Sequence, residues 1–269
     1  MIEEVGQILR EVSASVVMPR FDALLPHETE MKSADEPVTI ADREAEMLIT
    51  RDLLALLPGS RVVGEEACAA NPALLDNLAD GSVWIVDPID GTANFAAGRA
   101  PFAMMVALLE AGETIGAWIY DPQSDRLAVA ELGAGAWIGD DRLTAPAALS
   151  DPARWHGIVS RAFVPDGQHD TTERLAAFVG RADPTARCAG YEYPLVAGGE
   201  RDFALYWRTL VWDHAPGALL VTEAGGCVLH LDGTPYRPSV ARTGLLVARH
   251  AEVAARLLAC TYSLQNRAN

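Results

Sequence analysis

The chain has 269 residues, half of which are apolar and 22% of which are charged. This length suits one large domain or two closely packed ones, and the composition excludes fibrous, collagen-like and disordered proteins. Acidic residues outnumber basic ones 37 to 21, for a formal net charge of −16, which disfavours sequence-independent nucleic-acid binding. The N-terminus lacks the pattern of a signal peptide and no apolar run approaches membrane length, so we expect a soluble, cytoplasmic protein without membrane or nucleic-acid partners.

Hydrophobic periodicity and turn residues divide the first half into helices followed by an antiparallel meander. The expected elements are a helix from Ile2 to about Pro19, a mobile polar loop from His27 to Pro37, a helix from Thr39 to about Leu57, and strands at 61–63, 83–86, 102–109, 114–120, 126–131 and 136–138. In the second helix, Thr39 stands at the N-cap position and Asp42 follows in the first turn.

Helices and strands alternate in the second half. The expected elements are strands at 157–160 and 203–206, a helix at 171–179, a helix at 215–223 ended by Gly225-Gly226, strands at 228–229 and 245–247, and a helix at 251–264. The stretch from Pro146 to Pro152 is a candidate boundary. We therefore expect a single domain over residues 1–269, with an N-terminal α+β subdomain at about 1–148 and a C-terminal α/β subdomain at about 149–269.

Carboxylates collect where predicted strands end. They are Glu65 after the strand at 61–63, Asp87 and Asp90 after the strand at 83–86, and Asp213 after Val211-Trp212, where it opens a helix. Carboxylates buried without partners are costly. Gathered at the mouth of a sheet, they can instead share hard divalent cations, which prefer oxygen ligands.

The segment Asp87-Pro88-Ile89-Asp90-Gly91-Thr92 carries the sharpest signal. Pro88 fixes the backbone between the two aspartates and Gly91 lets the chain turn sharply beside them, so both carboxylates and the Ile89 carbonyl can approach one point. Two or three magnesium ions held there would clamp a phosphate and lower the pKa of a water molecule, and the turn at Gly91-Thr92 can present amides to phosphate oxygens. The pattern favours in-line attack of water on a phosphomonoester.

At these residues the chain resembles the inositol monophosphatase family of magnesium-dependent, lithium-sensitive phosphatases, over roughly Lys32 to Val247. The matching segments are, in chain order, Val38–Asp42 (VTIAD), Gly64–Glu66 (GEE), Trp84–Phe95 (WIVDPIDGTANF), Trp212-Asp213 and Thr222–Gly226 (TEAGG). The resemblance implies a mixed α/β (α+β) fold, the layered α-β-α-β-α sandwich shared with fructose-1,6-bisphosphatase. It also implies a homodimer that lithium inhibits by competing at a magnesium site.

The resemblance implies a set of metal ligands. Glu65, Asp87 and the Ile89 carbonyl would hold one magnesium ion, and Asp87, Asp90 and Asp213 would hold a second. Glu65 would also support a weaker third ion.

The resemblance also implies catalytic and phosphate-binding roles. Thr92, paired with Asp42, would orient and deprotonate the attacking water, with Glu65 as a further catalytic residue through its metal. The amides of Gly91 and Thr92 would take the phosphate. Lys32, in the mobile loop, would approach the site as the loop closes. The sequence is equally consistent with Lys32 being an ordinary surface lysine.

The departures from the family bear on the substrate. Tyr206 stands where inositol-hydrolysing members commonly place a glutamate, and Arg208 lies two residues on, at the same face if the strand continues. Bulky residues at Tyr191 and Glu192 are expected on the pocket wall, whereas the neighbouring Tyr193 is assigned to the core. The substrate-binding residues predicted in this way are Asp90, Gly91, Thr92, Tyr191, Glu192 and Arg208. Arg208 would pair either with a second anionic group of the substrate or with Glu192.

These observations predict a magnesium-dependent phosphomonoesterase that uses metal-activated water on a small phosphorylated polyol or sugar resembling inositol phosphate. The alternatives are fructose 1,6-bisphosphate, histidinol phosphate or 3′-phosphoadenosine phosphate as substrate, or a regulatory protein that retains the fold without catalysis. Ala93-Asn94-Phe95 argues mildly against a nucleotide. A haloacid-dehalogenase mechanism is excluded because its two aspartates stand two residues apart, whereas Asp87 and Asp90 stand three apart with Pro88 between them.

Overall fold

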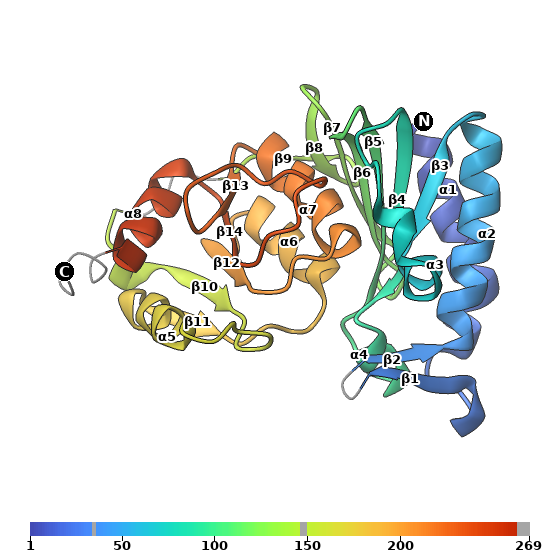
Figure 1. Cartoon of the computed structure of the whole chain (residues 1–269), viewed down its shortest axis with the longest axis horizontal. Helices are drawn as coiled ribbons and strands as arrows, with labels where there is room; N and C mark the ends of the chain where they lie inside the picture. The colour runs from blue at the N-terminus through green and yellow to red at the C-terminus, as the bar shows by residue number, and fades with distance from the viewer. Residues whose placement is uncertain (34–35, 146–149, 263–269) are drawn as a thin grey trace.

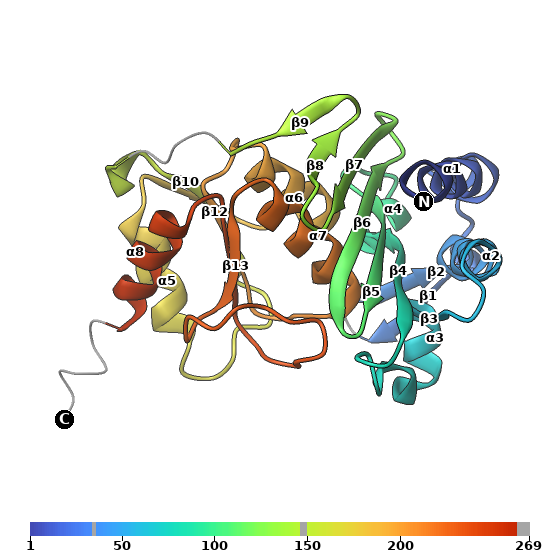
Figure 2. The same ribbon diagram turned by 90° about the horizontal axis from the view of Figure 1, so that it is seen from above.

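Helices and sheets alternate as α-β-α-β-α layers in the computed structural model, which describes residues 1–33, 36–145 and 150–262 (Figure 1). The layers are, in order, α1 (Ile2–Val12) with α2 (Ile40–Leu56), a seven-stranded sheet, α6 (Ala189–Ala197) with α7 (Val211–Glu223), a five-stranded sheet, and α5 (His169–Phe178) with α8 (Ala251–Tyr262). Figure 2 shows the two outer helix pairs at opposite ends of the molecule. The predicted layered sandwich is confirmed.

The first sheet has the strand order β3-β4-β5-β6-β7-β8-β9. Its strands are β3 (Arg61–Gly64), β4 (Ser82–Asp90), β5 (Ala103–Glu110), β6 (Glu113–Asp121), β7 (Arg126–Glu131), β8 (Gly135–Ile138) and β9 (Asp141–Leu143). Only the β3–β4 pair is parallel, and the remaining pairs form the predicted meander. Helices α1 and α2 cover one face and α6 and α7 the other. The central strands are therefore buried on both faces, as a continuous apolar run such as Val83–Val86 indicates.

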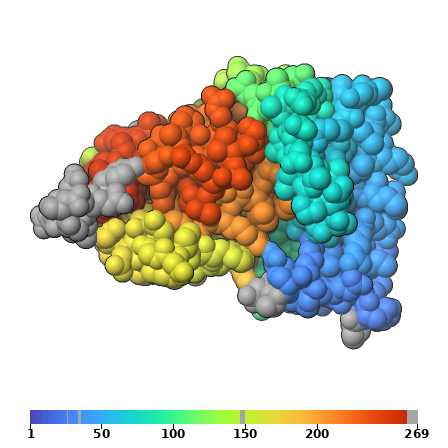
Figure 3. All heavy atoms as spheres, viewed as in Figure 1, coloured from blue at the N-terminus to red at the C-terminus, as the bar shows by residue number. Residues whose placement is uncertain are grey.

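The second sheet has the strand order β11-β10-β12-β14-β13 and mixes parallel and antiparallel pairs. Its strands are β10 (His156–Val159), β11 (Arg181–Asp183), β12 (Phe203–Tyr206), β13 (Cys227–His230) and β14 (Leu245–Ala248). Between the sheets, α6 and α7 approach closely because Gly217 has no side chain: a Cβ there would lie 2.1 Å from the ring of Tyr193. Figure 3 shows that early and late parts of the chain occupy opposite ends of the long axis.

Several predicted elements are confirmed. Helix α2 begins with the expected cap, in which the Ala41 amide donates to Thr39 Oγ1 at 3.1 Å and the Thr39 amide donates to Asp42 Oδ2 at 2.8 Å. The first helical run continues from α1 through a π-helical turn (Ser13–Val17) and a 3-10 turn (Met18–Arg20), and thus ends beside Pro19. Among the described residues, no helix has the length and apolar character needed to cross a membrane.

Other predictions need correction. The stretch predicted as a loop from His27 to Pro37 contains a hairpin of β1 (Thr29–Ser33) and β2 (Glu36–Thr39). Its first strand buries no side chain fully, so no alternation of apolar and polar residues marks it. The short helices α3 (Glu65–Ala70) and α4 (Thr92–Ala96), together with α6, were also not predicted.

Two predicted boundaries involve residues that the structure does not describe. The candidate boundary at Pro146–Pro152, with the subdomain limit near residue 148, includes residues 146–149, which lie outside the described residues. The predicted end of the last helix at residue 264 lies outside them as well.

Candidate active site

Three aspartates from two elements come together. Asp87 and Asp90 lie at the end of β4, and Asp213 lies in the first turn of α7. One carboxylate oxygen from each lies within 4.8 Å of the others. The pairing of β4 with β5 shifts register between Asp87 and Asp90, where Pro88 interrupts the regular ladder. This irregularity lets two aspartates three residues apart serve one cluster.

The cluster is a concentration of buried negative charge. Burial raises the pKa of Asp90 to about 7 and the pKa values of Asp87 and Asp213 well above their usual range, and the neighbouring carboxylates add to the effect. In the described part of the chain, no lysine or arginine forms an ion pair with any of the three. Oxygen donors that repel one another in this way are suited to a hard divalent cation, so the residues present fit the predicted metal site.

Glu65 faces Lys32 at the edge of this site. Glu65 begins α3 directly after β3, and Lys32 reaches it from β1. Lys32 Nζ lies 2.8 Å from Glu65 Oε1 and 2.5 Å from Glu66 Oε1. Burial acts to lower the pKa of Lys32, but the two carboxylates outweigh it and the net shift is upward. Lys32 is therefore a partly buried cation beside Glu65.

Glu46 is a positioning residue that sequence reasoning missed. From α2, its two carboxylate oxygens accept hydrogen bonds from the amides of Glu66 at 2.7 Å and Ala67 at 2.9 Å, at the start of α3. Gly64 makes room for this contact, since a Cβ there would lie 2.3 Å from the Glu46 carboxylate. The signal available in the sequence was an acidic residue one helical turn after Asp42, on the same face of the predicted helix.

Thr92 and Asp42 lie side by side, as the resemblance implied. Thr92 Oγ1 lies 3.1 Å from Asp42 Oδ1 and 2.8 Å from the carbonyl oxygen of Ile89. The other Asp42 oxygen accepts hydrogen bonds from the amide and hydroxyl of Thr39. Burial raises the pKa of Asp42 to about 7 although these bonds oppose the shift. Asp42 is therefore suited to accept a proton near neutral pH.

Gly91 makes the sharp turn that the sequence predicted. Its φ of +84° is in the left-handed region, and an added Cβ would lie 3.0 Å from the Pro101 carbonyl oxygen. Beside it, Asn94 Nδ2 donates to the Pro101 carbonyl at 2.8 Å and to the Ala186 carbonyl at 3.0 Å. The turn is thereby tied to the segment that precedes α6, a contact that no sequence motif announced.

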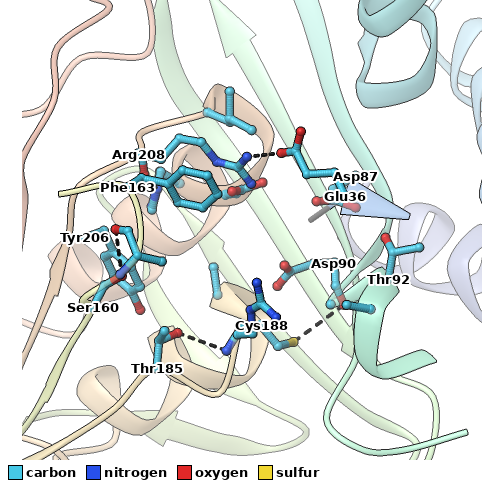
Figure 4. A pocket seen from close by; sticks show the side chains of 18 of the residues that line it. Glu36, Asp87, Asp90, Thr92, Ser160, Phe163, Thr185, Cys188, Tyr206 and Arg208 are labelled. Carbon is cyan, nitrogen blue, oxygen red and sulfur yellow. Dashed lines mark hydrogen bonds and ion pairs between the residues drawn. The ribbon is translucent and has the colours of Figure 1, made fainter. Parts of the chain in front are cut away.

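A cavity opens over these residues, with one wall from the first half of the chain and the other from the second half (Figure 4). The side of the early residues includes Glu36, Glu65, Asp87, Ile89, Asp90, Gly91 and Thr92. The opposite side includes Ser160, Phe163, Thr185, Arg187, Cys188, Tyr206, Arg208 and Asp213. Every predicted metal ligand lines this cavity, as do Thr92, Gly91 and Arg208.

Tyr191 and Glu192 do not line the cavity, which corrects their predicted place on its wall. Both lie on α6, with Tyr191 on the exposed side of the helix and Glu192 on the buried side. The Tyr191 side chain is exposed. Glu192 is buried behind the wall, where it accepts hydrogen bonds from Thr185 Oγ1 at 2.7 Å and Tyr206 Oη at 2.7 Å.

Arg208 makes neither a pair with Glu192 nor a direct contact with the aspartates. Its guanidinium forms an ion pair with Glu36 and stacks over the Phe163 ring, 4.1 Å from the ring centroid. Its carbonyl oxygen lies 2.9 Å from Nε2 of His214. Burial lowers the pKa of His214 to about 4, so the ring is neutral and Nε2 donates to Arg208 while Nδ1 accepts from Tyr193 Oη.

Comparison with known proteins identifies the family of the chain. A family model described as the inositol monophosphatase family matches residues 2–266. The chain is 31% identical over 233 residues to an inositol-1-monophosphatase of Bacillus subtilis (strain 168), covering 85% of this chain and 84% of that protein. It is 36% identical over 233 residues to a histidinol-phosphatase of Mycobacterium tuberculosis, covering 82% and 84%. An IMPase of Thermotoga maritima matches with a TM-score of 0.80 at 22% identity, over 100% of this chain and 99% of that one.

The chain belongs to the inositol monophosphatase family. The family and the relatives together indicate a phosphatase of phosphoric monoesters. The names of these relatives point to two chemically different substrates, a phosphorylated polyol and a phosphorylated amino alcohol.

Proposed function

We propose that this protein is a magnesium-dependent phosphomonoesterase that hydrolyses a small phosphorylated polyol or sugar to inorganic phosphate and an alcohol. The observation that carries the proposal is the cluster of Asp87, Asp90 and Asp213, three carboxylates within 4.8 Å of one another beside the Thr92–Asp42 pair.

Two or three magnesium ions would be held by the carboxylates of the cavity. Asp87 with Glu65 and the Ile89 carbonyl would hold one ion, and the three clustered aspartates would hold another. When bound, magnesium neutralises phosphate charge and lowers the pKa of a water molecule. The buried, mutually repelling carboxylates support this assignment because a cation relieves their repulsion.

Thr92 and Asp42 would handle the proton of the attacking water. The Thr92 hydroxyl faces two acceptors, Asp42 Oδ1 and the Ile89 carbonyl, to which it can only donate, so its lone pairs are free to accept a hydrogen bond from water. As the new phosphorus–oxygen bond forms, the water proton passes to Thr92 and the Thr92 proton passes to Asp42. The bond from phosphorus to the substrate oxygen breaks, that oxygen takes up a proton from solvent to become the alcohol, and Asp42 returns its proton to solvent. The amides of Gly91 and Thr92 would hold the phosphate.

The decisive experiment is phosphate release from a panel of sugar, inositol, histidinol and nucleotide phosphates, with and without magnesium. Asp90→Asn should lower turnover by several orders of magnitude while circular dichroism stays unchanged. Asp80→Asn is the matched control, because Asp80 is an exposed aspartate two residues before β4 with no described role in the cavity. It should behave like the wild type.

The same panel tests the non-enzymatic alternative. A regulatory protein that only retains the fold would release no phosphate and would be indifferent to Asp90→Asn. Equal turnover in the wild type and Asp90→Asn would refute the assignment of the site. Lithium inhibition that weakens as magnesium is raised, and a homodimer in light scattering, are further expectations of this proposal.

A further inference from the structure

We propose that the substrate carries a second anionic group besides the phosphate that is hydrolysed, and that Arg187 and Arg208 bind this group. The inference rests on the proposed phosphatase function and narrows its substrate class. Among the described residues that line the cavity, these two arginines are the only lysine or arginine side chains. The remaining charged residues of the lining are carboxylates.

Arg187 is presented to the cavity without a partner of its own. Its side chain is exposed and lines the cavity, and in the described part of the chain its guanidinium makes no hydrogen bond or ion pair. Its backbone has a φ of +59°, which residues other than glycine seldom adopt. An arginine therefore occupies a backbone conformation that glycine would adopt with less strain, and its charge is available to a ligand there.

The turn that carries Arg187 is held rigidly from behind. The Ala186 amide and Thr185 Oγ1 donate to Glu192 Oε1 at 2.5 and 2.7 Å, and the Arg187 amide donates to Thr185 Oγ1 at 2.9 Å. Asn94 binds the Ala186 carbonyl from the other side. Buried Glu192 is thus a positioning residue for the turn, which explains why it is acidic although it does not reach the cavity.

Arg208 is fixed on the same wall by different contacts. The Phe163 ring supports the guanidinium plane, and the Arg208 carbonyl is held by His214. In Figure 4, Arg208 and Phe163 lie across the cavity from Asp90 and Thr92. An anion bound by Arg208 would therefore lie away from the phosphate at the aspartates.

This wall argues against both a neutral polyol and a cationic substrate. A glutamate that could accept hydrogen bonds from several hydroxyls is missing, because Tyr206 lines the cavity and its hydroxyl is bonded to Glu192. The carboxylate that does line this end, Glu36, is already paired with Arg208. A substrate ammonium would meet Arg187 without a free carboxylate, whereas a carboxylate or phosphate would gain a charge-assisted contact.

The test compares phosphomonoesters that differ in the charge of their distal group. The first set of probes has two or three carbons. In this set 3-phosphoglycerate carries a distal carboxylate, glycerol 3-phosphate a distal hydroxyl and O-phosphoethanolamine a distal ammonium group. The second set has six carbons and consists of fructose 1,6-bisphosphate, with a distal phosphate, and fructose 1-phosphate, with a distal hydroxyl. With magnesium present, kcat/KM should be at least tenfold higher for the anionic probe than for the neutral probe in one or both sets, chiefly through a lower KM.

Variants assign the preference to the arginines. Arg187→Gln should reduce the ratio of kcat/KM between anionic and neutral probes at least fivefold, and Arg187→Lys should restore part of it. Arg161→Gln is the matched control: Arg161 neighbours the cavity-lining residues but points to Glu173, 2.7 Å away, and should leave the ratio as in the wild type.

Two kinds of failure can be told apart. Magnesium-dependent turnover with no preference for the anionic probe in either set, or a preference for the ammonium probe, would overturn this inference and leave the phosphatase function standing. An equal loss for every probe in Arg187→Gln would also overturn it, because that result indicates a structural role. No magnesium-dependent release from any probe would overturn both the inference and the proposed function.

Discussion

The ion pair between Glu36 and Arg208 joins the two walls of the cavity. Glu36 begins β2, in the hairpin that also carries Lys32, and Arg208 lies between β12 and α7. Both side chains are 35% exposed, and ion pairs of that exposure contribute at most about 1 kcal/mol to stability. The pair therefore matters less for the stability of the fold than for the position and charge of Arg208.

Neutralising Glu36 should make Arg208 more available to an anionic substrate. We expect Glu36→Gln to lower KM for the preferred anionic probe about threefold, in line with the small energy of such a pair. Steady-state kinetics with the anionic and neutral probes provides the measurement. Glu44→Gln, which removes an ion pair with Arg20 outside the cavity, is the control. A rise in KM of equal size for both probes would contradict the expectation.

Removing the Glu46 carboxylate should impair metal binding without touching a metal ligand. Glu46→Ala leaves two amides of α3 without their acceptor, which should lower the free energy of unfolding by about 1–3 kcal/mol. Because α3 carries Glu65, the magnesium concentration for half-maximal activity should rise about tenfold. Denaturant unfolding and magnesium titrations measure the two effects.

The control for Glu46 is its half-buried neighbour on α2, Glu44, which pairs with Arg20 instead. Glu44→Ala should leave the magnesium requirement as it is in the wild type. A normal magnesium requirement in Glu46→Ala would show that Glu65 does not depend on this contact.

Thr92 should be required for the chemical step rather than for binding. Thr92→Val removes the hydroxyl that is proposed to pass the proton of the attacking water to Asp42, and kcat should fall by a factor of about 10² to 10⁴ while KM changes little. Thr92→Ser keeps the hydroxyl and should retain most of the activity. If the serine variant were as slow as the valine variant, packing by the methyl group rather than proton transfer would explain the loss.

The stability of the metal-free protein should depend on pH through Asp90. Its pKa is about 7 in the folded protein, above the value of about 3.9 in an unfolded chain, so folding favours the protonated form. That stabilisation is present below about pH 4 and is lost as the pH rises through about 7.

Comparison with Asp90→Asn, which cannot ionise, isolates this effect. In the absence of metal, the variant should gain stability over the wild type between pH 5 and pH 8, by an amount on the order of 2 kcal/mol. Magnesium should restore the wild type at pH 8 and have little effect on the variant. Thermal unfolding across this pH range measures the difference, and a difference independent of pH would count against it.

The sequence was most informative where local chemistry decides the structure. The segment from Asp87 to Thr92 combines a fixed proline, a left-handed glycine and two acids, and each feature restricts the backbone directly, so the turn could be predicted. The capping of α2 by Thr39 is equally local. Glu192 was misplaced because its orientation depends on α6, a helix that contains Pro194 and that only tertiary packing supports.

Other features depend on contacts between distant parts of the chain. The Glu36–Arg208 pair joins residues 172 positions apart, and the contact of Glu46 with α3 spans a strand and a turn. No periodicity announces such contacts.

Gly217 lies one helical turn after Asp213 and lets α7 pack against the ring of Tyr193. A larger residue there would clash with that ring, and the α7 helix that carries Asp213 would have to shift relative to α6. The spacing of the two interior helices thus affects the distance of Asp213 from Asp87 and Asp90. Evolutionary or engineered changes in metal preference can therefore arise at a small, apolar position that no ion ever touches.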